Sequence, residues 1–275
     1  MVSRGVSYTR LLVNVMKTKS IAFAVPVFVA GFVWQIPQAQ PAGAEIRVIC
    51  SNGIKGAMDK LVPEYEHKSG RHIAIQYGAS AVLKRTIEGG EPFDLAILTP
   101  GVVDDLVKDG KIAAGTGTDV ARADLAAGVR AGAPKTDIST PEAMKRRLLA
   151  AKSITFAKEG AATAAINKMI ERLGIGEQLK SKLVLQTESG KAEETVAAGE
   201  NEIVFGPVSE IIPVSGIEVL GLFPKEFQVP LIMTAAVGAK AQDAEGAQAF
   251  VKFLASPAAA GAIKASGMEP VGKKK

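Results

Sequence analysis

Cysteine and aromatic residues are scarce in this chain. Its 275 residues include one cysteine, one tryptophan, three tyrosines and ten phenylalanines, against 28 glycines. A lone cysteine cannot form an internal disulfide, and so few aromatic side chains disfavour a stacking surface for single-stranded nucleic acid. Cys50 follows "IRVI", whose last residue is too bulky for the lipid-attachment motif of a lipoprotein. The pattern instead predicts a buried structural thiol.

Catalytic motifs are also missing. The sequence contains no GxSxG nucleophile turn, no GxxxxGK[ST] phosphate loop and no HExxH zinc motif. The two histidines, His67 and His72, fall away from any turn expected to bind a ligand. The adjacent acids Glu193 and Glu194 would diverge around a helix axis, so they would not act as one acid–base couple. These absences favour a binding protein that performs no chemistry and needs no cofactor or metal.

The first 44 residues differ from the rest. They carry four basic residues and no acid, then the apolar run "IAFAVPVFVAGFVW", then small residues ending at Ala44. This order is typical of a secretory signal peptide, so we expect cleavage after Ala44 and a periplasmic mature protein. The alternative, a membrane anchor, is disfavoured because the run is shorter than the ~20 residues that span a bilayer. Whether translation begins at Met1 or Met16 stays open.

The leader also carries much of the net charge. The whole chain is +5 at pH 7, and removal of the four basic leader residues leaves about +1. A nearly neutral mature protein gives no electrostatic reason to expect a nucleic-acid partner.

Strand-like and helix-like runs alternate along the mature chain. "EIRVIC" precedes an amphipathic run that Gly70 ends, and "HIAIQY", "SAVLKRTIEGG", "FDLAIL" and "VVDDLVKDGKI" continue the alternation. This rhythm predicts an α/β fold with mainly parallel sheets flanked by helices.

Small and polar residues follow two of the predicted strands. Ser80 follows "HIAIQY" at the expected N-cap of a helix, after Gly78 and Ala79. The residues after the first strand are Ser51, Asn52 and Gly53. Ligands of open α/β sheets lie beyond the carboxyl ends of the strands, and helix N-termini attract anions, so these residues predict an anion site. Plain helix capping by the serines is the alternative.

The second half of the chain offers a similar position. Residues 153–157, "SITFA", read as a strand, and the helix after it begins near Ala162 or Thr163. Thr163 is therefore a candidate ligand donor, with a simple helix cap as the alternative.

Three segments resemble the extracytoplasmic molybdate-binding protein of ABC importers. They are the run from Ile46 to Leu106, "VAAGENEIVFGPVSEI" and "LASPAAAGAIKASGMEPV". The resemblance implies a type II periplasmic binding fold, in which two α/β lobes joined by two crossing strands close over a small ligand. The boundaries that we expect are 1–44 for the signal peptide, 45–124 and 226–275 for lobe 1, and 125–225 for lobe 2.

The resemblance also implies a ligand site. The family's oxyanion-binding serine in the second strand-to-helix turn matches Ser80, while its serine in the first turn aligns with Gly53. Pro207 stands where the family has a tyrosine in the second lobe. With the turn residues above, the predicted ligand-binding set is Ser51, Asn52, Gly53, Ala79, Ser80, Thr163 and Pro207.

The expected function is capture of a small anion between the lobes by a monomeric protein, for delivery to an inner-membrane ABC permease. The anion stays open among a molybdate-like oxyanion, a small organic acid and a phosphorylated acid, because neutral donors and helix termini bind many oxyanions. The alternative is an enzyme, a hydrolase or isomerase of small anions, built on the same two lobes.

Overall fold

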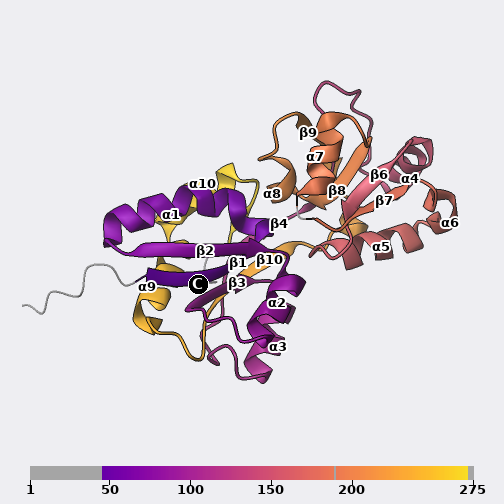
Figure 1. Ribbon diagram of the computed structural model, residues 1–275. Helices are drawn as coiled ribbons and strands as arrows, with labels where there is room; N and C mark the ends of the chain where they lie inside the picture. Colours follow the sequence, from indigo (N-terminus) through magenta and orange to yellow (C-terminus); the bar gives the residue numbers. More distant parts are fainter. Residues whose placement is uncertain (1–44, 189, 272–275) are drawn as a thin grey trace, which may run out of the picture. The chain divides into compact units, whose positions relative to one another are not determined.

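The computed structural model describes residues 45–188 and 190–271 (Figure 1). The predicted signal peptide, residues 1–44, lies outside the described residues. Two separate β-sheets, each covered by helices, make up the described part of the chain. We call each sheet with its helices a lobe.

Lobe 1 contains a six-stranded sheet in the order β11-β4-β10-β3-β1-β2. Its strands are β1 (Glu45–Ser51), β2 (His72–Gly78), β3 (Leu95–Leu98), β4 (Thr118–Ala123), β10 (Leu231–Val237) and β11 (Glu269–Pro270). Its helices are α1 (Lys55–Ser69), α2 (Ser80–Glu88), α3 (Pro100–Lys108), α9 (Ala244–Leu254) and α10 (Pro257–Ala265), and the short 3₁₀ helix η1 (Asn52–Ile54) precedes α1.

Alternation along β1 sends side chains to both faces of this sheet. Ile46, Val48 and Cys50 are buried with residues of α1, α9 and α10, whereas Ile49 is buried with residues of α2 and α3. The two groups of helices therefore cover opposite faces of the sheet. Cys50 is fully buried, as predicted.

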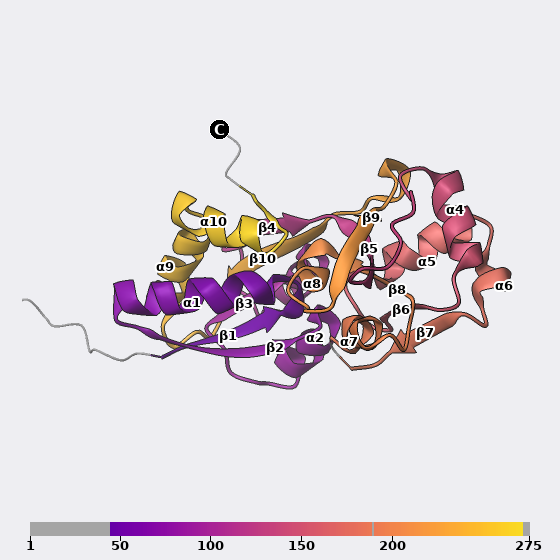
Figure 2. The ribbon, with the colours of Figure 1, turned by 90° about the horizontal axis from the view of Figure 1, so that it is seen from above.

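Lobe 2 contains a five-stranded sheet in the order β7-β6-β8-β5-β9. Its strands are β5 (Leu125–Arg130), β6 (Ile154–Ala157), β7 (Leu183–Gln186), β8 (Ile203–Pro207) and β9 (Ile217–Leu222). Its helices are α4 (Pro141–Ala150), α5 (Thr163–Arg172), α6 (Gly176–Leu179), α7 (Lys191–Ala198) and α8 (Val208–Ile211), and Figure 2 shows them from a second direction. Among the described helices, none is long and apolar enough to cross a membrane.

The predicted α/β fold with two lobes is confirmed, although the sheets are mixed. In lobe 1, β1 pairs in parallel with β2 and β3, and in lobe 2, β6 pairs in parallel with β7 and β8. The strands next to the crossings, β10 and β5, run antiparallel to their neighbours. A local sequence pattern predicts that a segment forms a strand but not the direction in which its neighbours run. The antiparallel pairing of β5 and β10 could therefore not be predicted in this way.

The chain passes between the lobes twice. The first passage is at Asp124, between β4 and β5, and the second follows β9 and includes the 3₁₀ helix η2 (Lys225–Phe227) before β10. Gln228 ties the two passages together: its Oε1 accepts from Leu125 N at 2.9 Å, and its Nε2 donates to Leu125 O at 2.8 Å and to Phe223 O at 3.3 Å. The lobe boundaries set out above remain a prediction.

Candidate functional site

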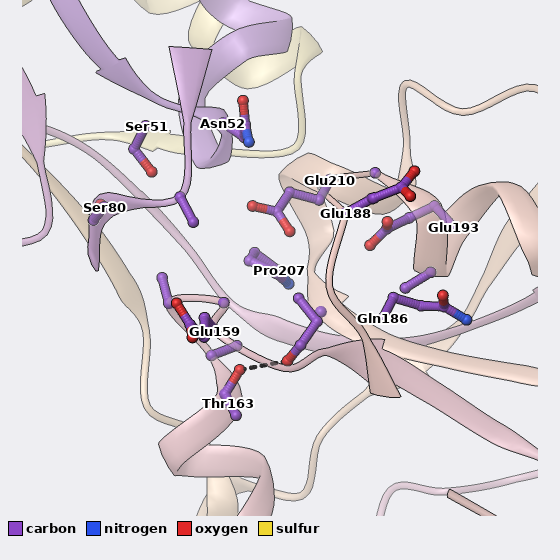
Figure 3. Close-up of a pocket in the computed structure, with 18 of the residues that line it drawn as sticks. Ser51, Asn52, Ser80, Glu159, Thr163, Gln186, Glu188, Glu193, Pro207 and Glu210 are labelled. Atoms are coloured by element: carbon purple, nitrogen blue, oxygen red, sulfur yellow. Dashed lines mark hydrogen bonds between the residues drawn. The ribbon is translucent and has the colours of Figure 1, made fainter. Parts of the chain in front are cut away.

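A cavity of about 250 Å³ lies where loops of both lobes meet beyond the ends of their strands (Figure 3). Lobe 1 lines it with Ser51, Asn52, Gly78, Ala79, Ser80 and Val82. The polar lining from lobe 2 includes Glu159, Thr163, Gln186, Thr187, Glu188, Glu193 and Glu210.

Helix N-termini surround this cavity. Lining residues stand at or within three positions of the start of α2, α5 and α7. The first amides of a helix have no partner within the helix and carry the positive end of its dipole. The cavity therefore favours a negatively charged ligand, as the sequence predicted.

Ser80 and Ser51 can each donate a hydrogen bond into the cavity. Both are 3% exposed. The Oγ of Ser80 accepts from Thr99 N at 3.3 Å, and the Oγ of Ser51 accepts from Gly53 N at 3.4 Å. Because both hydroxyls act as acceptors in these bonds, their protons stay available to a ligand.

The predicted N-cap position of Ser80 is wrong. Ala79 is the N-cap, with extended backbone angles (φ −70°, ψ 140°), and Ser80 is the first residue of α2. β2 continues to Gly78, so one extended residue is enough to join it to the helix. Ser80 thus makes no cap bond, whereas Ser51 does cap η1 through its bond from Gly53.

The other predicted residues fall into two groups. Thr163 begins α5 as expected, but its hydroxyl donates to Ala157 O at 2.7 Å, so its proton is already used (Figure 3). Asn52, Ala79 and Pro207 also line the cavity. Gly53 does not: it is buried behind the lining, and its carbonyl accepts from Ser209 Oγ at 2.7 Å, which links η1 to α8. Contact of the six lining residues with a ligand remains a prediction.

The predicted set omitted four glutamates on the lobe 2 side of the cavity. They are Glu159, Glu188, Glu193 and Glu210, and among the described residues that line the cavity none is a lysine or arginine. Glu159 is balanced by Arg85 of lobe 1, whose Nη2 lies 2.9 Å from its Oε2. Glu188 is exposed to solvent.

Glu193 and Glu210 form a pair with unusual protonation. Glu193 is 5% exposed, and burial raises its pKa. Removal of the Glu210 carboxyl from water, together with the nearby charge of Glu193, raises the pKa of Glu210 to about 8. Both causes disfavour a charged carboxylate, so Glu210 is mostly protonated at neutral pH.

The acidic neighbour of Glu193 in the folded chain is not the adjacent Glu194. Glu194 is exposed, whereas Glu193 is buried. The carboxyl that lies beside Glu193 at Gly206 belongs to Glu210 on α8, which follows β8 in the chain. The signal in the sequence for Glu210 is its place in "FGPVSE", where an acid follows the turn at the end of a predicted strand.

Comparison with known proteins identifies relatives over most of the chain. Residues 46–269 match the family model described as bacterial extracellular solute-binding protein. The chain is 30% identical over 239 residues to aconitate isomerase from Pseudomonas sp., covering 85% of this chain and 90% of the relative. It is 26% identical over 231 residues to the molybdate-binding protein ModA of Azotobacter vinelandii, covering 82% and 89%.

A solved structure supports the fold. The periplasmic molybdate-binding protein of Azotobacter vinelandii superposes with a TM-score of 0.70 at 18% identity, covering 81% of this chain and 98% of the other. The type II periplasmic binding fold and the resemblance to molybdate-binding proteins are confirmed.

The interpretation that the protein performs no chemistry is wrong. A relative 30% identical across 85% of the chain is an enzyme, aconitate isomerase. The chain lacks the local nucleophile, phosphate and zinc motifs, whereas Glu193 and Glu210 come together only in the folded chain. By the extent of the family match, the chain belongs to the bacterial extracellular solute-binding protein family.

Proposed function

We propose that this protein is an exported isomerase of a small unsaturated polycarboxylate, of which aconitate is the example that its enzyme relative suggests. The observation that carries the proposal is the cavity itself, in which Ser51 and Ser80 face the Glu193–Glu210 pair (Figure 3). One side offers donors for carboxylates, and the other offers groups that exchange protons near neutral pH.

This arrangement suits isomerisation by proton transfer. A methylene carbon beside both a carboxylate and a C=C bond loses a proton with unusual ease, because the resulting negative charge spreads over the double bond and the carboxyl groups. Return of a proton to the other end of the three-carbon unit moves the double bond. An acid–base group works best when its pKa lies near the working pH, and Glu210 meets this condition.

The glutamates do not prevent an anion from binding. Glu210 is mostly protonated at neutral pH, and a protonated carboxyl can donate a hydrogen bond to a substrate carboxylate. Glu159 is paired with Arg85. The helix N-termini then supply most of the field that the ligand experiences.

Capture of an oxyanion for an ABC permease is the second candidate. The observation that favours it is the similarity to the molybdate-binding protein ModA. Against it stand the four glutamates, because a doubly charged inorganic oxyanion needs donors on all sides.

Incubation of the purified protein with cis-aconitate and, separately, with trans-aconitate tests the proposal. Proton NMR should show both samples converging on the same mixture, with ligand and protein otherwise unchanged. Calorimetric titration with molybdate and sulfate should show weak binding or none. Tight molybdate binding without conversion of either aconitate isomer would replace the isomerase by the delivery protein.

A further inference from the structure

Glu193 and Glu210 approach each other at a glycine. Glu193 lies on α7 before β8, Glu210 lies on α8 after it, and Gly206 is in β8 itself. A Cβ atom at Gly206 would lie 3.4 Å from Glu193 Oε1 and 3.9 Å from Glu210 Oε2. The missing side chain therefore leaves the space in which the two carboxyls face each other.

Among the described residues around this pair, the basic side chains are each paired with another acid. On the cavity side stand Glu188 and the Arg85–Glu159 ion pair. On the other side stand Glu194, whose charge adds to the raised pKa of Glu193, and Lys55, whose Nζ lies 2.6 Å from Asp59 Oδ2. Because Lys55 and Arg85 each have an acidic partner, burial and mutual repulsion set the protonation of the pair.

A second cavity, of about 550 Å³, adjoins the first behind the pair. Asn52, Gly190, Glu193 and Glu210 line both cavities. The second one is bounded by exposed side chains, including Lys55, Asp59 and Glu194. Glu210 thus faces the ligand cavity on one side and a solvent-accessible space on the other.

We infer that Glu210 is the catalytic acid–base group of the proposed isomerisation, that the neighbouring Glu193 is a positioning residue that tunes proton exchange at Glu210, and that Glu210 exchanges its proton with water through the second cavity. This inference rests on the proposed function. It assigns the chemistry to one carboxyl among the four that line the cavity.

The step balances without any other reactant. The ionised Glu210 carboxylate takes a proton from the methylene carbon of the substrate, so a C–H bond breaks and an O–H bond forms. The electron pair left behind delocalises over the adjacent double bond and the substrate carboxylates. Glu210 then returns a proton to the far carbon of the three-carbon unit, which restores its carboxylate and leaves the double bond shifted.

Four proteins test the inference: the parent, Glu210→Gln, Glu193→Gln and the matched control Glu200→Gln. Glu200 is exposed just beyond the other end of α7, so its substitution removes one negative charge from the same region without touching the cavity. For each protein, kcat and kcat/KM for aconitate are measured from pH 5 to 9, and Kd is measured by calorimetry at pH 7.

Glu210→Gln should lower kcat by roughly 100-fold or more, the usual size of a general acid–base contribution, with Kd changed by less than about fivefold. Glu193→Gln should move the pH profile of kcat/KM to lower pH, because the charge that raises the pKa of Glu210 is lost. A purely structural Glu193 would change kcat and stability without moving the profile. Glu200→Gln should match the parent.

In deuterium oxide, the parent should produce an isomer that carries deuterium at the reprotonated carbon. If the parent isomerises aconitate and Glu210→Gln keeps more than a tenth of the parental kcat, Glu210 is not the acid–base group. The proposed function would still stand. An unmoved profile in Glu193→Gln would overturn the positioning role. Product free of deuterium would overturn exchange through the second cavity. Failure of the parent to isomerise aconitate would instead count against the proposed function.

Discussion

At the scale of one residue, substitution of Ser80 should affect ligand binding more than stability. Its hydroxyl proton is free while its Oγ accepts from Thr99 N. Ser80→Ala should weaken binding of the best ligand by roughly 1.5–3 kcal/mol, the value of a hydrogen bond to a charged group, and should lower the free energy of unfolding by only about 1 kcal/mol. Calorimetric titration and urea denaturation measure the two quantities.

Ser256→Ala is the matched control for that experiment. The Ser256 hydroxyl donates to Phe253 O at 2.7 Å in lobe 1, and Ser256 is not among the residues that line the cavity. This variant should lose similar stability and keep parental affinity. If Ser80→Ala also keeps parental affinity, Ser80 does not bind the ligand.

Glu210 should also make stability depend on pH. Its pKa is about 8 in the folded protein, whereas an ordinary glutamate has a pKa of about 4.3. The folded state therefore holds a proton that the unfolded chain releases, so the free energy of unfolding should fall as pH rises from about 4.3 to about 8. Glu193, with its pKa raised, acts in the same direction.

Thermal unfolding of the parent and of Glu210→Gln across pH 4–9 measures this effect. The parent should lose melting temperature across the window, and Glu210→Gln should show a clearly smaller decline because one titrating group is gone. Glu200→Gln should follow the parent. Equal slopes in parent and Glu210→Gln would show that Glu210 is ionised in the folded state throughout.

At the scale of secondary-structure elements, one side chain, Gln228, connects the two passages between the lobes. Gln228 holds both backbone groups of Leu125, where β5 begins, and the carbonyl of Phe223, just after β9. Gln228→Ala should lower the free energy of unfolding by roughly 2 kcal/mol, because three hydrogen bonds are lost and Leu125 N loses its acceptor, although Leu125 O keeps its bond from Phe223 N.

Urea denaturation checks that value against Gln178→Ala, an exposed glutamine on α6 whose removal should cost less than about 0.5 kcal/mol. If the two variants lose the same free energy of unfolding, the Gln228 side chain does not stabilise the two passages between the lobes.

At the scale of the whole molecule, the sequence predicts export. The predicted leader, residues 1–44, lies outside the described residues. If residues 1–44 form a cleaved leader, the secreted protein should begin at Glu45 and Cys50 should carry no lipid. Mass spectrometry of periplasmic material measures both. Ala44→Leu should block cleavage and leave the leader attached, since the cleavage site requires a small residue. An acylated Cys50 or an intact parental leader would contradict the prediction.

Local patterns were enough to predict the elements that build the site. The strand "HIAIQY" became β2, the helix ending at Gly70 became α1, and that glycine adopts the left-handed conformation (φ 69°) that commonly ends a helix. Ser51 and Ser80 lie in the turns where the sequence predicted them, because the ends of strands and the starts of helices are marked by neighbouring residues.

The sequence by itself determined the alternation of strands and helices and the position of Ser51 and Ser80 beside the ends of β1 and β2, since periodicity and turn residues act over a few positions along the chain. Only the tertiary structure decided that Glu193 and Glu210 face each other. Their helices precede and follow β8 in the chain and pack into one core cluster, and Gly206 in that strand leaves space beside both carboxyls. Burial then changes the protonation of both, and burial depends on contacts between distant parts of the chain that no local pattern records.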